Sequence, residues 1–444
     1  MPFFRRTGRG QRKHGQSSPE KPVRNAHQHG WRIKHSIMPE KKKILILTGD
    51  AGMGHRSAAN ALQQALLQKY DQDCQVEIIN PLDHPKTPGF VRETETDYDK
   101  IVKFIPDLYQ IGYEVSDAAV PSTLIEAGYT VVLFEALRDI LADTTPDMVI
   151  TTYPLYQAPL KAVLELNKID IPLITVITDL VTVHHIWFNH HVTLTTVPTE
   201  VVREKALEAG MKPGQLMLTG IPVNPKIAAL QDSPKTEVRK TLGWDPNQTT
   251  VLVTGSPRIT KLQDTLSVID QCLMPFQTKI TTGGDDVLYK DLQPVNWQHP
   301  TKIYNFIENM PAMMRAADLI VCKAGGLIVT ESLASGLPLL LIHALPGQEI
   351  GNADYIVEHD AGAFCKTPEE ILRTLADWLG GSQTRLEQVS ENASRLGNKN
   401  AAFQIADKAW SVLNEYQPKQ FTPLLQKEAD RLRDLLSRFD ISGL

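Results

Sequence analysis

The stretch KILILTGDAGMGHRSAANAL, residues 43–62, joins an apolar run to a helical pattern through three closely spaced glycines. KILIL at 43–47 is typical of a buried strand, and the residues after His55 have the apolar spacing of an amphipathic helix. A glycine-rich turn between a strand and a helix offers unpaired backbone N–H groups to an anion. The stretch therefore predicts an α/β fold, and its turn either binds phosphate or places His55 for chemistry.

The alternation of strand-type and helical runs continues along the chain in two series. The first series of strands is expected at 43–49, 75–80, 148–154, 172–179 and 194–198. The second is expected at 249–256, 279–284, 302–307, 319–325 and 337–343. This rhythm predicts two doubly wound, Rossmann-like domains with parallel sheets.

The domain limits follow from this rhythm and from composition. We expect a basic tail over 1–40, a first domain over 41–225, a second over 226–400, and helices over 401–444 that cross back or pack on the surface. Residues 1–43 contain twelve Lys or Arg and two Glu, a formal charge of +10, whereas the whole chain carries −5. Such a tail is typical of disorder and could attract anionic lipid. Alternatively, Met38 is the true start and the tail is a mis-assigned extension.

Composition excludes several classes of protein. No apolar run is long enough to span a bilayer, and the tail lacks the apolar core of a signal peptide. The four cysteines are far apart and match no zinc spacing, which favours a reducing compartment. No nucleic-acid partner is expected.

A second glycine turn, in VCKAGGLIVTESLASGLP at 321–338, is the better phosphate cradle. Gly325 and Gly326 end a strand, and Glu331 lies one to two turns into the following helix, where a carboxylate can accept both hydroxyls of a ribose. The first turn, by contrast, has GxxGxG spacing and no GK[ST], so it is neither a dinucleotide fingerprint nor a P-loop. Downstream, Gln348, Glu349 and Asn352 follow another strand and suit a hydroxyl-rich ligand.

Several ordered blocks together resemble one family. They are LILTGDAGMGHRSAANAL, TVITDLVTVHHIWFNHHV, PTEVVREKALEAG, TGIPVNP, NFIENMPAMMRAADLIVCKAGG and GQEIGNADYIVEHDAGAF, spread over residues 43–366. The chain resembles the monogalactosyldiacylglycerol synthase and processive diacylglycerol glucosyltransferase family, which is related to the peptidoglycan lipid-linked N-acetylglucosaminyltransferase. The resemblance implies a GT-B fold, two facing Rossmann-like domains with an interdomain cleft, and a UDP-sugar on the C-terminal domain.

The resemblance also implies roles for individual residues. Phe306 and Ile307 would lie against uracil, Gly325 and Gly326 would meet the diphosphate, Glu331 the ribose, and Gln348 and Glu349 the sugar hydroxyls. Asn352, in the same polar cluster, is a further donor-binding candidate. His55 matches the histidine that faces the reacting centre, and Asp50 would orient it or serve as the base. Gly54, Pro88, His184 and Trp187 would lie on the acceptor or lipid side.

One loop departs from the family pattern. The glycine-rich loop after the first strand of the donor domain is VTGSPRITK here, residues 253–261. Gly255 and Ser256 remain as candidate donor-binding residues, but Pro257 removes an N–H and stiffens the turn. The phosphate contact expected there is in doubt, although Arg258 or Lys261 could substitute by charge.

Glycosyl transfer requires a base for the acceptor hydroxyl and stabilisation of the leaving diphosphate. His55 suits the first task, because the unperturbed pKa of histidine is ~6.5. No DxD motif follows a strand, so no metal or other cofactor is expected, and a metal at the histidines of HHIWFNHH (184–191) is the weaker interpretation. The segment 85–117 places lysines beside aromatics, as in an interfacial segment, or packs on the first domain.

The sequence thus predicts an inverting, metal-independent glycosyltransferase that moves galactose or glucose from a UDP-sugar to diacylglycerol. It would act as a peripheral protein on an anionic membrane surface, on the cytoplasmic face of the cell membrane. Two alternatives remain: an N-acetylglucosaminyltransferase acting on a polyprenyl-linked precursor, and a nucleotide-sugar binder without catalysis. The choice of hexose, the processivity and the oligomeric state are left open.

Overall fold

The computed structural model describes residues 40–50, 53–89, 91–92, 119–256, 259, 262–381 and 384–418. All of them except Glu40 belong to one unit, Lys41–Leu444. The basic tail, the greater part of the lysine- and aromatic-rich segment, and Pro257, Arg258 and Lys261 lie outside the described residues.

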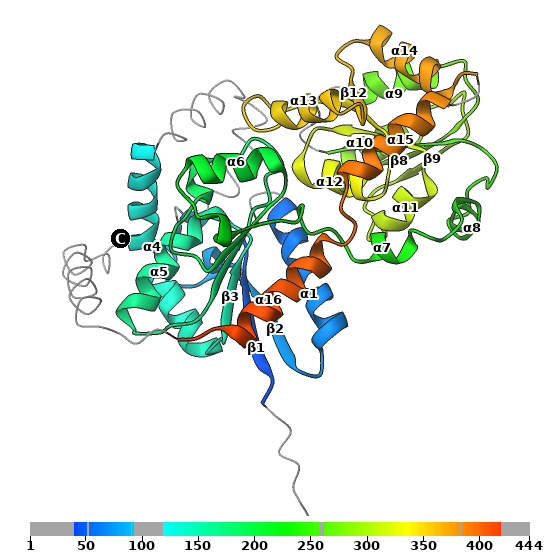
Figure 1. The fold of residues 1–444 in the computed structure, drawn as a ribbon. Helices are drawn as coiled ribbons and strands as arrows, with labels where there is room; N and C mark the ends of the chain where they lie inside the picture. Colours follow the sequence, from blue (N-terminus) through cyan, green and yellow to red (C-terminus); the bar gives the residue numbers. More distant parts are fainter. Residues whose placement is uncertain are drawn as a thin grey trace, which may run out of the picture. The chain divides into compact units, whose positions relative to one another are not determined.

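The first series of strands forms a six-stranded parallel sheet with the order β2-β1-β3-β4-β5-β6 (Figure 1). The strands are β1 (Lys42–Leu47), β2 (Cys74–Ile79), β3 (Met148–Thr151), β4 (Leu173–Val176), β5 (Leu194–Val197) and β6 (Leu216–Leu218). The chain reverses its direction of progress between β1 and β3, where Leu47 pairs with Thr151. In open α/β sheets ligands bind beyond the carboxyl ends of strands at such a switch point. His55 and the first glycine turn therefore lie at the edge where a ligand is expected.

The second series forms another six-stranded parallel sheet, with the order β12-β11-β10-β7-β8-β9. The strands are β7 (Thr250–Thr254), β8 (Gln277–Thr281), β9 (Thr301–Tyr304), β10 (Leu319–Lys323), β11 (Leu339–His343) and β12 (Gly362–Phe364). Its switch point lies between β7 and β10, where Val253 pairs with Val321. The turns that contain Gly255 and Gly325 leave these two strands, so both lie at the switch point.

Helices cover both sheets, and apolar side chains of the helices and strands pack in four large buried clusters. The helices are α1 (Met53–Tyr70), α4 (Ala119–Thr144), α5 (Gln157–Leu166), α6 (Glu200–Glu208), α7 (Lys226–Leu230), α8 (Lys235–Thr241), α9 (Leu262–Asp270), α10 (Asp286–Leu292), α11 (Met310–Ala316), α12 (Gly326–Ala334), α13 (Ile350–Glu358), α14 (Pro368–Leu379), α15 (Thr384–Leu396) and α16 (Ala401–Glu415). Within the described ranges the last helix is α16, which packs on α1 and the first sheet (Figure 1). The chain thus returns to its first half after completing the second. The predicted boundary at 225/226 falls just before α7 and stays a prediction.

Nine of the ten predicted strands end before the residue that the sequence suggests, and for two of them a side-chain hydrogen bond explains the difference. The apolar run at 302–307 predicts a strand to Ile307, but β9 ends at Tyr304. Asn305 then turns the chain, because its Oδ1 accepts a hydrogen bond from Thr282 Oγ1 at 3.0 Å and its amide donates to Asp286 Oδ1 at 2.6 Å. Similarly, β3 ends at Thr151, whose hydroxyl donates to the Tyr153 carbonyl at 2.8 Å. In both places a side-chain hydrogen bond competes with the regular strand conformation where the strand ends.

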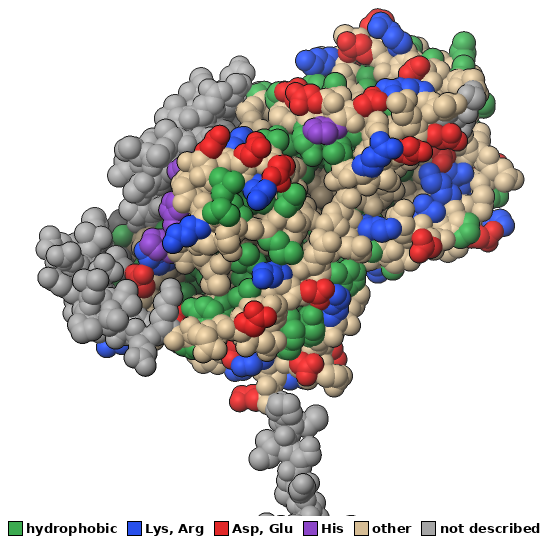
Figure 2. All heavy atoms as spheres, in the orientation of Figure 1, with side chains coloured by type: hydrophobic (Ala, Val, Ile, Leu, Met, Phe, Trp, Pro, Cys, Tyr) green, Lys and Arg blue, Asp and Glu red, His purple; other side chains and the backbone are tan. Residues whose placement is uncertain are grey.

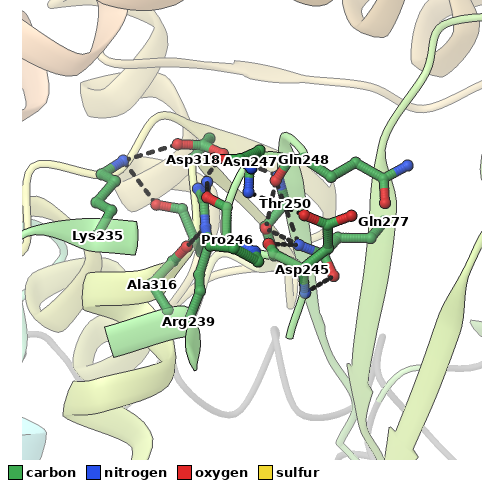
Figure 3. A network of polar contacts seen from close by, with 11 residues as sticks. Lys235, Arg239, Asp245, Pro246, Asn247, Gln248, Thr250, Gln277, Ala316 and Asp318 are labelled. Carbon is green, nitrogen blue, oxygen red and sulfur yellow. Dashed lines mark hydrogen bonds and ion pairs between the residues drawn. The ribbon is translucent and has the colours of Figure 1, made fainter. Parts of the chain in front are cut away.

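A polar network fixes the amino ends of the two central strands of the second sheet (Figure 3). Asp318, just before β10, accepts a hydrogen bond from the Thr250 N–H at 2.8 Å and forms ion pairs with Arg239 and Lys235. The Arg239 side chain is buried and also donates to the Ala316 carbonyl at 2.7 Å. The network sets the positions of β7 and β10, and hence of the two turns at their other ends.

None of the helices in the described ranges is both long and apolar enough to cross a bilayer. On the face in Figure 2, acidic and basic side chains are interspersed over the described surface.

Candidate active site

The first glycine turn brings an aromatic ring against the backbone. A Cβ added at Gly49 would lie 2.8 Å from Cδ2 of Tyr153, so only glycine allows the two segments to approach this closely. His55, the candidate base, lies in the first turn of α1. Its ring meets the Tyr153 ring edge-on, with 4.9 Å between centroids. The glycine turn therefore positions a histidine at the switch point of the first sheet.

The His55 ring is held through one nitrogen. Its Nδ1 lies 2.9 Å from the Thr152 carbonyl oxygen and 2.7 Å from Thr178 Oγ1. A carbonyl oxygen can only accept a hydrogen bond, so this contact assigns the proton to Nδ1 and leaves a lone pair on Nε2. A histidine anchored in this way can take a proton at Nε2, as a general base requires.

The surroundings of His55 favour its neutral form. Burial lowers its pKa below the ordinary value, and the charge of Asp179, the Thr152 hydrogen bond and the charge of Asp50 offset this only in part. The imidazole is consequently neutral, and able to accept a proton, at pH 7.

Asp50 lies close to His55 but is held by other groups. Arg56 donates to both of its oxygens, at 2.8 and 2.7 Å, and Asn80 donates at 3.2 Å. The hydrogen bonds from Arg56 are the largest cause of a lowered pKa, so Asp50 is ionised. Thr152 and Thr178 supply the contacts to Nδ1 of His55. The expected role of Asp50, to orient His55 or to serve as the base, stays a prediction.

Trp187, expected on the acceptor side, is fully buried beside the histidine. The centroids of the Trp187 and His55 rings are 6.2 Å apart, and the indole N–H donates to Asp179 Oδ2 at 2.7 Å. Trp187 therefore lies beside His55 within the protein core, and its contact with an acceptor lipid stays a prediction.

The other residues expected on the acceptor side are placed as follows. A Cβ added at Gly54 would meet no described atom within 4 Å, so the space beside this residue is open. Pro88 begins a short turn in which its carbonyl accepts from the Val91 N–H at 3.0 Å. His184 caps a short 3-10 helix, His185–Trp187, by accepting from the Ile186 N–H at 3.2 Å. In the described part of the chain no three His, Cys, Asp or Glu residues are grouped as a metal site would need, the histidine-rich stretch included.

The second glycine turn is built around the end of β10. Gly325 caps α12, and Asn352 fixes the turn by donating from its amide to the Ala324 carbonyl at 2.9 Å. A Cβ added at Gly326 would lie 3.5 Å from the Thr178 carbonyl oxygen. The start of α12 thus lies against the residue that holds His55, and the two turns contribute to one site.

The polar cluster after β11 is engaged with protein groups. Gln348 donates to Asp179 Oδ1 at 3.3 Å, which links this cluster to the loop after β4. The buried carboxylate of Glu349 forms an ion pair with Lys323 through Oε1, and its Oε2 accepts from the Leu345 N–H at 3.1 Å. Contacts of Gln348 and Glu349 with sugar hydroxyls stay predictions.

Glu331 differs from these residues because its carboxylate has no hydrogen-bond partner within the described ranges. Burial raises its pKa to about 7. A carboxylate left without partners in the second turn of a helix can accept hydrogen bonds from a ligand, as the ribose prediction requires.

The remaining donor-side residues follow β7, β8 and β9. Phe306 is 64% exposed, so its ring is available for stacking. The Gly255 N–H donates to the Thr281 carbonyl at 2.6 Å, so it is already satisfied and cannot serve a phosphate. The Ser256 carbonyl accepts from the Ile259 N–H at 2.9 Å. Ile307 is partly buried against the second core, so of the predicted uracil contacts Phe306 is the more accessible.

Four residues of the site were missed by sequence reasoning: Thr152, Thr178, Asp179 and Lys323. Lys323 ends β10 and Thr152 directly follows β3, while Thr178 and Asp179 lie in the loop after β4, so all four are at the carboxyl edge of a sheet. That position, rather than a motif, is the signal that could have found them.

Comparison with known proteins agrees with this geometry. The family model described as monogalactosyldiacylglycerol (MGDG) synthase matches residues 55–223, and the glycosyltransferase family 28 C-terminal domain matches 250–408. Monogalactosyldiacylglycerol synthase 1, chloroplastic, of Arabidopsis thaliana is 33% identical over 82% of this chain and 70% of its own length. The chloroplastic synthase of Spinacia oleracea is 30% identical over 84% of this chain and 73% of its own.

Solved structures support the fold. MurG of Acinetobacter baumannii matches 84% of this chain and all of its own, with a TM-score of 0.53 and 16% identity. The calicheamicin glycosyltransferase CalG4 matches 85% and all of its own, with a TM-score of 0.54 and 14% identity. These likenesses confirm the predicted α/β fold of the GT-B type.

Proposed function

The chain belongs to the monogalactosyldiacylglycerol synthase family of glycosyltransferases, and from this premise we propose that it transfers a hexose from a UDP-sugar to the free hydroxyl of diacylglycerol. The hexose is galactose or glucose, and the product is a glycosyldiacylglycerol. The relatives' names support galactose.

The observation that carries the proposal is the hydrogen bonding and the protonation of His55. Its Nδ1 is fixed by Thr152 and Thr178, its Nε2 is left as an acceptor, and burial keeps it neutral. A binding protein without catalysis has no need of a neutral, oriented base at a switch point.

The reaction follows as a single displacement. The acceptor oxygen attacks the anomeric carbon while its proton passes to His55 Nε2. The bond from the anomeric carbon to the β-phosphate oxygen breaks, and its electron pair stays on that oxygen. One displacement from the opposite face inverts the anomeric configuration.

The donor binds at the second sheet in this proposal. Phe306 stacks on the base, Glu331 accepts the ribose hydroxyls, and the N-terminus of α12 receives the diphosphate. The helix N-terminus is a positive group at the diphosphate, so transfer proceeds without a divalent cation.

The acceptor implies a membrane surface. We place the protein at the cytoplasmic face of a membrane as a peripheral protein, with the charge of +10 over residues 1–43 as an attraction for anionic lipid.

The test is incubation of the protein with diacylglycerol in anionic vesicles and each UDP-hexose in turn, with and without EDTA. Product is read by mass and sugar analysis. Monohexosyldiacylglycerol from one donor, undiminished by EDTA, is the expected result. No transfer with any donor would overturn the proposal. Transfer only to a polyprenyl-linked acceptor would show that diacylglycerol is not the acceptor.

A further inference from the structure

A lysine at the end of β10 is directed at the second glycine turn. The parallel register between β10 and β11 shifts between Cys322 and Lys323, so that Lys323 pairs with His343. Such an irregularity re-aims the side chain that follows it. Lys323 is thereby separated from the regular pleat at the point where the strand enters the turn.

The ammonium group of Lys323 lies over the turn itself. A Cβ added at Gly325 would be 2.7 Å from Lys323 Nζ and 3.2 Å from its Cε. The end of the lysine side chain therefore lies against the backbone of the turn. The cation lies beside the residue that caps α12, where the helix also presents its positive end.

The Lys323 ion pair is largely buried. The Glu349 side chain is 6% exposed and that of Lys323 15%. Glu349 is itself fixed by the Leu345 N–H, and it lies one position before α13. A buried ion pair contributes little net stability, because desolvation offsets the attraction. Stability therefore does not explain a fixed cation here, whereas an anion bound at the turn would.

We propose that Lys323 is a catalytic residue that contacts the diphosphate and neutralises the charge gained by the leaving β-phosphate oxygen, and that Glu349 is its positioning residue. This inference rests on the proposed function. When the bond from the anomeric carbon to that oxygen breaks, the electron pair remains on the diphosphate. The ammonium group keeps its proton and stabilises the added negative charge.

This assignment changes the expectation for Glu349. Sequence resemblance implies that its carboxylate contacts sugar hydroxyls, but the structure places Oε1 on Lys323 and Oε2 on a backbone N–H. The two roles differ in what they predict. If Glu349 contacts only the sugar, its substitution affects the binding of the UDP-sugar alone. If it positions Lys323, its substitution affects the binding of UDP as well.

The first experiment compares the binding of UDP and uridine by calorimetry in the wild type, Lys323→Met, Lys323→Arg and Glu349→Gln. Lys290→Met, an exposed lysine of α10, is the matched control. Lys323→Met should lose about tenfold in affinity for UDP and none for uridine. Unchanged uridine binding shows that the fold and the base site are intact. Glu349→Gln should also lower the affinity for UDP, because Lys323 loses the residue that positions it, and Lys323→Arg should retain part of the wild-type affinity.

The second experiment measures turnover with the UDP-hexose. Lys323→Met should lower kcat by about 10²–10³-fold, with Lys290→Met unchanged. Wild-type affinity for UDP together with wild-type kcat in Lys323→Met would overturn the role of Lys323 alone. A wild type that binds no UDP and transfers no sugar would overturn the proposed function instead, so the two failures are distinguishable. If Glu349→Gln affects the binding of UDP-hexose but not that of UDP, Glu349 contacts the sugar and does not position Lys323.

Discussion

Thr178 Oγ1 lies 2.7 Å from Nδ1 of His55, and the residue after it in the chain, Asp179, binds both Trp187 and Gln348. The loop after β4 thus holds the proposed base from one side and reaches the donor-side cluster from the other. Both connections depend on single side chains, so each can be tested separately.

Replacing Thr178 by Val should lower kcat by about tenfold, because the imidazole keeps only its backbone partner and its orientation is less fixed. Thr178→Ser preserves the hydroxyl and should restore most of the rate. The affinity for UDP should be the same in both variants. Equal kcat in Thr178→Val and the wild type would show that the Thr152 carbonyl alone orients the ring.

Replacing His55 by Gln should lower the transfer rate by about 10²–10⁴-fold with unchanged affinity for UDP, because only proton transfer is lost. In the wild type, kcat at saturating UDP-hexose should rise with pH up to a pKa below 6.5 and stay level above it, since burial lowers the pKa of His55, the neutral form is active, and saturation removes the effect of Glu331 on donor binding. Rates measured from pH 4.5 to 8 check this. An acid limb that persists in His55→Gln would assign the titration to another group.

Replacing Asp179 by Asn should move the acid limb to lower pH. The charge of Asp179 raises the pKa of His55, so its removal lowers that pKa further. Asp143→Asn, on the exposed side of α4, is the charge-matched control and should leave the profile in place. A shift to higher pH would contradict the assigned proximity.

The affinity for UDP should fall below pH 7 by up to tenfold per pH unit, because the ribose requires the ionised form of Glu331 and burial raises its pKa to about 7. The sign for stability is opposite. A carboxyl whose folded pKa exceeds its unfolded value favours folding most at low pH, and that contribution is lost as the pH rises through 7.

Glu331→Gln separates these effects. It should bind UDP more weakly at pH 8 and lose the pH dependence between 5.5 and 7. Calorimetry over that range is the measurement. A dependence that survives the substitution would exclude Glu331 as its origin.

Replacing Asp318 by Ala should destabilise the protein by about 3–5 kcal/mol, because the buried guanidinium of Arg239 loses its counter-charge (Figure 3). Asp318→Asn keeps an acceptor for the Thr250 N–H and should cost less. Glu391→Ala, in an exposed pair with Arg395, should cost below about 1 kcal/mol. Urea unfolding of the three variants checks the order. Similar losses in Asp318→Ala and Glu391→Ala would contradict it.

The fold could be predicted from sequence because apolar runs, glycine turns and helical periods agree along the described chain. Strand ends were less accurate, since at Asn305 and Thr151 a side-chain hydrogen bond, not hydrophobicity, ends the strand. Two short strands, Leu216–Leu218 and Gly362–Phe364, were not expected at all, because three residues carry no period.

The residues of the site could be predicted from the sequence more readily than the contacts between them. His55 and Glu331 are recognisable from their place in a glycine turn or helix. The partners of His55 are 97 and 123 residues away along the chain, and one of them is a backbone carbonyl, so no local pattern contains them. The Lys323–Glu349 pair likewise depends on two strand ends that only the sheet brings together.

The helix α16 has a consequence for biosynthesis. Ala402, Ile405, Ala406, Ala409 and Leu413 belong to the same buried cluster as β1 and α1, yet a ribosome makes them hundreds of residues later. During translation this cluster, which α1 covers only in part, stays partly exposed while the whole second half is made. Nascent chains stalled before residue 401 should therefore engage chaperones, and release of α16 should end that dependence.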